Sequence, residues 1–108
     1  MKQYHLLTGG YTAEENQKGL HSLIFDGKAV TEADASDVFA SPSYLLYDAG
    51  FVYTAEERND GAAAGRIAID AAGRFQDYTR FDIPGTGICH LEKHGAVLYA
   101  AGYHGGCI

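Results

Sequence analysis

The chain has 108 residues, of which 46% are hydrophobic and 20% are charged, and its formal net charge is −6. This composition excludes a wholly disordered chain, and the eight scattered Lys and Arg residues exclude the basic face that nucleic-acid binding requires. No apolar run approaches the roughly 20 residues of a membrane span, and the N-terminal residues do not resemble a signal peptide. With two Cys residues we expect reduced thiols and a cytoplasmic protein without nucleic-acid or membrane partners.

Short apolar runs separated by turn-forming residues predict β-strands along the whole chain. In chain order they lie near 3–8, 19–25 and 28–39, then near 43–48, 51–56, 65–70 and 74–82, and finally near 88–93 and 96–102. Gly, Asp and Asn between the runs favour tight turns. A helix is the alternative prediction for the Ala-rich stretch at 61–65, but this stretch is short and bounded by glycines. We therefore predict an all-β chain of antiparallel hairpins.

The sequence repeats with a constant offset of 46 residues. Segments 6–11, 52–57 and 98–103 align without gaps, and the same offset pairs Gly27 with Gly73. This period is typical of β-propeller blades, which have about 40 to 50 residues and four antiparallel strands, here named a to d from the channel outwards. We predict β-propeller blades over the whole chain: a blade without strand a at 1–40, a complete blade at 41–84 and a half blade at 85–108.

Several segments resemble motifs of the seven-bladed lactonase propellers. Residues 9–12, 18–20 and 25–26 are similar to the opening G-T-Y-T, G-I and F-D of that family. Residues 41–45 resemble N-P-S-Y-L, 52–57 resemble L-Y-A-V-N-E, 87–91 resemble G-P-C-H-V, and 98–106 resemble L-Y-V-A-N-Y-H-G-G. The chain departs from these motifs where Glu56 and Gly102 replace Asn and where Ile88 replaces Pro. The family includes bacterial 6-phosphogluconolactonases of propeller type and is related to carboxymuconate cycloisomerase propellers.

The resemblance implies a hydrolase of sugar lactones in carbohydrate metabolism that uses no cofactor. Seven blades of this period need about 322 residues, so we expect the chain to be the N-terminal third of a longer protein, with about 2.3 blades. The resemblance places much of the catalytic set on later blades, which implies that the fragment alone is inactive. Because both ends leave unpaired strands and apolar blade faces, we expect the isolated chain to self-associate.

Hairpin geometry predicts where the chemically useful side chains meet. Tyr44 and His90 begin a strands, whereas Tyr11, Glu57 and Tyr103 end b strands. In an antiparallel hairpin these positions share one edge of the blade, so we expect all five at one rim of the channel, joined by the b–c loops at 12–18 and 58–64. Small ligands bind where side chains from successive blades converge.

His90 and Glu57 are the predicted catalytic pair. Opening a lactone requires an activated water or a proton for the leaving oxygen, and an imidazole oriented by a carboxylate can supply either. Arg58 is the candidate for binding a substrate phosphate or carboxylate, and Tyr11, Tyr44 and Tyr103 are candidates for stacking on the substrate or hydrogen bonding to it. The alternatives are structural: a hydrogen bond in the channel wall for His90, a backbone or Arg58 contact for Glu57, a solvated Arg58, and core packing for the tyrosines.

A metal site and a non-catalytic function are the remaining alternatives. The candidate ligands are Cys89, His90, His94, His104 and Cys107, but His90 and His94 should lie at opposite ends of one hairpin, about 10 Å or more apart. We therefore expect no metal. The second functional hypothesis is a propeller module that binds a protein or ligand, or assembles with its own copies, because a fold alone does not fix a function.

Overall fold

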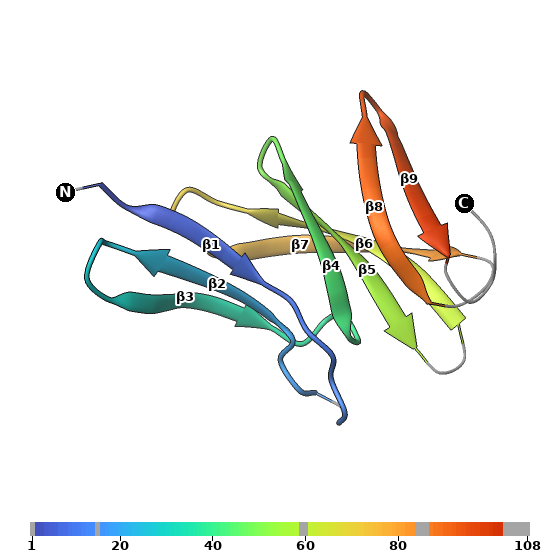
Figure 1. Ribbon diagram of the computed structural model, residues 1–108, viewed down its shortest axis with the longest axis horizontal. Coiled ribbons are helices and arrows are strands. Elements are labelled where there is room, and N and C mark those ends of the chain that lie inside the picture. The colour runs from blue at the N-terminus through green and yellow to red at the C-terminus, as the bar shows by residue number, and fades with distance from the viewer. Residues whose placement is uncertain (1, 15, 59–60, 84–86, 103–108) are drawn as a thin grey trace.

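The computed structural model of the protein describes residues 2–14, 16–58, 61–83 and 87–102. These residues form three antiparallel sheets that lie one after another along the molecule (Figure 1). The first contains β1 (Tyr4–Thr8), β2 (Leu20–Phe25) and β3 (Val30–Ser36); the second β4 (Pro42–Asp48), β5 (Phe51–Arg58), β6 (Gly61–Ile69) and β7 (Phe75–Ile83); the third β8 (Ile88–His94) and β9 (Val97–Gly102). The described part of the chain contains no helix suited to crossing a membrane. The all-β architecture of antiparallel blades is confirmed.

The repeat seen in the sequence recurs in the backbone. β4 and β8 cover equivalent positions, and each has a register shift after its first residue, between Pro42 and Tyr44 and between Ile88 and His90. The turns between the last two strands of the first two blades also match, since Gly27 and Gly73 both adopt left-handed angles with φ of 96° and 83°. Glycine adopts this region at no steric cost. A 46-residue unit therefore specifies strands, bulges and turns alike.

The middle sheet is covered on both faces. Val52 and Ile67 on one face pack with Leu20 and Phe39 of the first blade. Tyr53 and Ala55 on the other face pack with residues of the β8–β9 sheet, notably Ile88 and Leu91. Alternate residues of β5 therefore belong to two different interfaces, as the period of two along a strand requires.

One predicted boundary is wrong. The third strand of the middle blade was expected near 65–70 and the preceding residues as part of a loop, but β6 begins at Gly61, which pairs with Arg58 of β5. The extension consists of Ala62, Ala63 and Ala64, which are all buried. Their small side chains fit between closely packed sheets, so tertiary packing decides the local conformation and overrides the low strand propensity of alanine.

Gly65 permits a close contact between the first two blades. A Cβ atom at this position would lie 2.6 Å from Cζ of Phe39 and nearer still to the neighbouring ring carbon Cε1. Phe39 is 1% exposed, and its ring also meets Tyr78 edge-on with centroids 5.7 Å apart. The missing side chain of Gly65 thus makes the space that the Phe39 ring occupies.

We expect Gly65→Ala to lower the free energy of unfolding by about 1–3 kcal/mol, because the ring must leave its place in a close-packed core. The matched control is Gly61→Ala in the same strand, where an added Cβ meets nothing within 4 Å; its effect should stay within about 0.5 kcal/mol. Urea denaturation followed by circular dichroism measures both. Equal effects of the two substitutions would contradict this account of Gly65.

Candidate functional site

Tyr44 and His90 lie side by side on the innermost strands of successive blades. Their ring centroids are 4.8 Å apart, with an angle of 52° between the ring planes. Each is the third residue of its strand and follows a register shift that re-aims the backbone. Nε2 of His90 lies 3.5 Å from Oε2 of Glu92, and the two side chains are 52% and 70% exposed. An accessible imidazole with an adjacent carboxylate and aromatic ring therefore occupies the edge where β4 and β8 begin.

Tyr11 and Glu57 form a second pair. Glu57 is the penultimate residue of β5, and Tyr11 follows β1 in the loop between the first two strands. A hydrogen bond to the Glu57 carboxylate, together with its negative charge, raises the pKa of the Tyr11 phenol above its ordinary value of 10.0. The O–H of the Tyr11 phenol is therefore engaged with the Glu57 carboxylate.

The two pairs are separate in their contacts. His90 has Glu92 as its acidic neighbour, and within the described ranges no hydrogen bond or ion pair joins His90 to Glu57. Tyr103 lies outside the described residues. The structure thus brings together Tyr44 with His90 and Tyr11 with Glu57, and the joint action of His90 and Glu57 stays a prediction.

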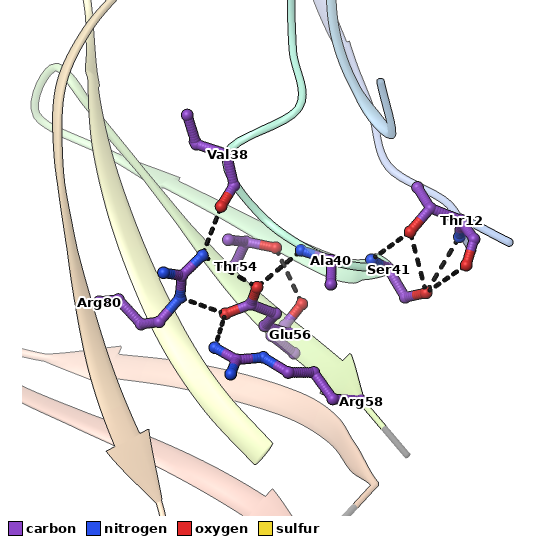
Figure 2. Close-up of polar contacts among 9 residues, drawn as sticks. Thr12, Val38, Ala40, Ser41, Thr54, Glu56, Arg58 and Arg80 are labelled. Atoms are coloured by element: carbon purple, nitrogen blue, oxygen red, sulfur yellow. Dashed lines mark hydrogen bonds and ion pairs between the residues drawn. The ribbon is translucent and has the colours of Figure 1, made fainter. Parts of the chain in front are cut away.

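Glu56, which the sequence analysis treated only as a departure from a motif, has the densest polar contacts of this region (Figure 2). Its side chain is 1% exposed. Oε2 accepts hydrogen bonds from Nε of Arg80 at 2.6 Å and Nη2 of Arg58 at 2.9 Å. Oε1 accepts the backbone N–H of Ala40 at 2.6 Å and Nη2 of Arg80 at 3.1 Å. The same Arg80 donates to the carbonyl of Val38.

The electrostatics of Glu56 follow from these contacts. Burial by itself would raise the pKa of the carboxyl group, but hydrogen bonds from Arg80, Arg58 and the Ala40 N–H outweigh it, so the pKa lies below its ordinary value of 4.5. Glu56 is therefore a buried carboxylate held ionised by two guanidinium groups. The position of Glu56 on a buried face could have been predicted from the sequence. Val52, Thr54 and Glu56 alternate along one strand and therefore share the face that packs on the first blade.

Arg58 lies on the face of β5 opposite to Glu57, because the side chains of adjacent residues in a strand point to opposite faces. Together with Arg80 it lines a polar hollow of about 370 Å³ between the first two blades, where Thr12, Gln17 and Asp37 also contribute. The Arg58 and Arg80 side chains are 34% and 32% exposed. The guanidinium groups thus contact Glu56 on one side and an open polar space on the other.

Metal ligation finds no support in the residues described. No group of three or more His, Cys, Asp or Glu side chains among them is arranged to hold a metal ion. His90 and His94 lie four residues apart on β8 and pair with Ala101 and Val97 respectively. Cys89 is an exposed free thiol, and His104 and Cys107 fall outside the described residues.

Comparison with known proteins gives one clear result. The family model described as "Lactonase, 7-bladed beta-propeller" matches residues 5–108. No individual curated protein matches the chain.

Acidification should expose the contribution of Glu56 to stability. Because its pKa is lower in the folded state, its stabilising effect is complete above the ordinary carboxyl pKa of 4.5 and is lost as the pH falls below that value. We expect Glu56→Gln to destabilise the fold near neutral pH by about 2 kcal/mol, less than the roughly 3–5 kcal/mol of a fully buried pair, because the arginines reach solvent. The difference between the two proteins should shrink below pH 4.5.

Urea denaturation at several pH values measures this difference. Glu14→Gln is the control, since Glu14 is exposed and its replacement should change stability by less than about 0.5 kcal/mol. A Glu56→Gln effect that is the same at pH 3 and at pH 7 would show that the ionised carboxylate is not the stabilising species.

Proposed function

Because the chain belongs to the seven-bladed β-propeller lactonase family, we propose that its rim residues serve the hydrolysis of a sugar lactone of the 6-phosphogluconolactonase kind. The observation that carries the proposal is the pairing of Tyr44 with an accessible His90 at the edge of two successive inner strands. In a propeller, the inner strands border the channel in which ligands bind. His90 is thus available to a small molecule that enters the channel.

The proposed reaction uses His90 as a general base. A free imidazole nitrogen takes a proton from water, and the resulting hydroxide adds to the lactone carbonyl carbon. The bond between that carbon and the ring oxygen then breaks, and the ring oxygen leaves as an alkoxide that receives the proton from the imidazolium. The product is an open hydroxy acid. Glu92 lies beside the imidazole, and the Tyr44 ring restricts how the imidazole can turn.

Glu57 and Tyr11 are proposed to contact the substrate from a neighbouring part of the same rim. The Tyr11 phenol donates its O–H to the Glu57 carboxylate, so the phenol oxygen and the carboxylate can accept hydrogen bonds from the hydroxyl groups of a sugar ring. Tyr103 is proposed as a further substrate contact. Three sheets do not close a ring, since a propeller requires at least four blades. We therefore propose that turnover requires a closed ring that contains these residues.

The test is the hydrolysis of a hexono-δ-lactone by the 108-residue chain and by a closed propeller that contains it. We expect activity in the closed ring alone, with His90→Gln lowering kcat by about 10²–10⁴-fold, the usual contribution of a general base. His94→Gln, at the far end of the same strand, is the matched control and should leave kcat unchanged. A closed ring without activity on any sugar lactone, or equal effects of the two substitutions, would overturn the proposal.

Arg58 is proposed to bind the phosphate of a phosphorylated lactone. A guanidinium group that is one-third exposed in a polar hollow offers charge-assisted hydrogen bonds to an anion. We expect Arg58→Gln in the closed ring to raise KM about tenfold for the 6-phospho lactone, the cost of about 1.5–3 kcal/mol for a lost charged hydrogen bond. KM for the unphosphorylated lactone serves as the internal control. Equal increases for both substrates would assign Arg58 a purely structural role.

A further inference from the structure

The loop between β1 and β2 is hydrogen-bonded to the residue that precedes β4. The backbone N–H of Thr12 donates to Oγ of Ser41 at 2.9 Å, and the backbone N–H of Ser41 donates to Oγ1 of Thr12 at 2.9 Å. The Ser41 hydroxyl in turn donates to the Thr12 carbonyl at 3.3 Å (Figure 2). Ser41 is only 7% exposed. Two residues that are 29 positions apart therefore exchange hydrogen bonds in both directions between the first two sheets.

Close packing at both ends of the same loop accompanies these hydrogen bonds. A Cβ atom added to Gly19 would lie 2.7 Å from Cγ2 of Thr12 and 2.8 Å from Cδ of Pro42. A Cβ atom added to Gly9 would collide with the Pro42 carbonyl oxygen. Pro42 is the first residue of β4 and is buried. The loop thus begins and ends against Pro42, so packing and hydrogen bonds together fix its path over the start of β4.

Ser41 also contacts the strand that carries Glu57. Its carbonyl accepts the backbone N–H of Glu57 at 3.4 Å. The backbone of Ser41 is left-handed, with a φ of 44°, a conformation that is uncommon for a residue with a side chain and persists only where the surroundings enforce it. Ser41 therefore connects three parts of the candidate site: the loop with Tyr11, the end of β5 with Glu57, and the start of β4 that leads to Tyr44.

Tyr11 depends on this attachment for its position. It is 75% exposed, so packing does little to restrict its side chain, and it lies in a loop rather than in a strand. An exposed side chain keeps much of its rotational freedom unless its backbone and its contacts are fixed. The adjacent residue, Thr12, supplies the fixed backbone, and Glu57 supplies the contact with the phenol.

We propose that Thr12 and Ser41 are positioning residues, whose reciprocal hydrogen bonds hold the phenol of Tyr11 at the rim. Glu57, which donates its N–H to the Ser41 carbonyl, is kept within reach of that phenol by the same arrangement. The importance of this for turnover rests on the proposed function, in which Tyr11 and Glu57 contact the sugar ring. Side chains that bind a substrate must be held in place by a supporting layer of contacts, and Thr12 and Ser41 form that layer.

NMR of the chain with isotope-labelled tyrosine tests the positioning without any substrate. The Cζ signal of Tyr11 is the one that is lost in Tyr11→Phe, and Glu57→Ala gives the position of that signal when the carboxylate contact is absent. Thr12→Val exchanges the hydroxyl for a methyl group, so at neutral pH it should move the signal toward its position in Glu57→Ala. Thr12→Ser restores the acceptor oxygen and should leave the signal at its wild-type position.

Ser41→Gly is the second variant, because it removes the other hydroxyl while glycine adopts the left-handed backbone at no steric cost. It should move the Tyr11 signal in the same direction as Thr12→Val. The matched control is Thr8→Val, the same chemical change at an exposed residue at the end of β1, and it should leave the signal unchanged. Circular dichroism monitors folding of each variant, and Ser41→Gly carries the test if Thr12→Val loses its sheet signal.

In a closed propeller, Thr12→Val should raise KM for the lactone about two- to tenfold, the usual contribution of one hydrogen bond, with little change in kcat because His90 is untouched. A Tyr11 signal that does not move in folded Thr12→Val or Ser41→Gly, or that moves equally in Thr8→Val, overturns the proposal. So does a loss that falls on kcat rather than on KM. A closed ring without lactonase activity, in which the Tyr11 signal still moves as expected, would overturn the proposed function and support the positioning of Tyr11 by Thr12 and Ser41.

Discussion

The middle sheet is packed on both faces, and the positions of Tyr44, Glu57 and Arg58 depend on this. Val52, Ala55 and Ala63 have no exposed surface, although they point to two different neighbours. Burial of apolar area is the main favourable term in folding, so a strand whose alternate residues all lose contact with water is fixed in register. A slip by one residue would exchange Glu56 with Glu57 and place each carboxylate on the wrong face of the sheet.

The Glu56 cluster then joins the first two blades by polar contacts. Its carboxylate accepts the N–H of Ala40, and Arg80 bonds both to it and to the carbonyl of Val38. Val38 and Ala40 belong to the segment that leaves β3 and enters β4, so the cluster fixes the path of the chain between blades. Buried ion pairs contribute less to net stability than their Coulomb attraction suggests, because both charges lose water. The contacts of the Glu56 cluster therefore favour a role in fixing the orientation of the first sheet relative to the second.

Local pattern was enough to predict most strands, and the repeat was enough to predict how they are grouped. The offset of 46 residues pairs Gly27 with Gly73 in the sequence, and both adopt left-handed backbone angles in the structure. The start of β6 was missed because alanine has no strong strand preference, and only the space between two sheets decides its conformation. The pairing of Glu56 with Arg80, 24 residues apart, depends on the register of three strands and was not readable from spacing.

For the site residues too, the sequence predicts local features such as the edge of a hairpin, whereas contacts between different blades depend on the tertiary structure. The hairpin rule predicted a common rim for the site residues and a contact between His90 and Glu57. It did not predict the pairing of Tyr44 with His90 or of Tyr11 with Glu57, which comes from the structure. Which carboxylate approaches His90 is a finer question, and alternation along β8 answers it: Glu92 lies two residues away and so points to the same side as His90. An imidazole whose acidic neighbour comes from its own strand keeps that neighbour whatever the adjacent blades do. The convergence of residues from different blades, by contrast, depends on how far the sheets rotate about the common axis, and only a closed ring fixes that rotation.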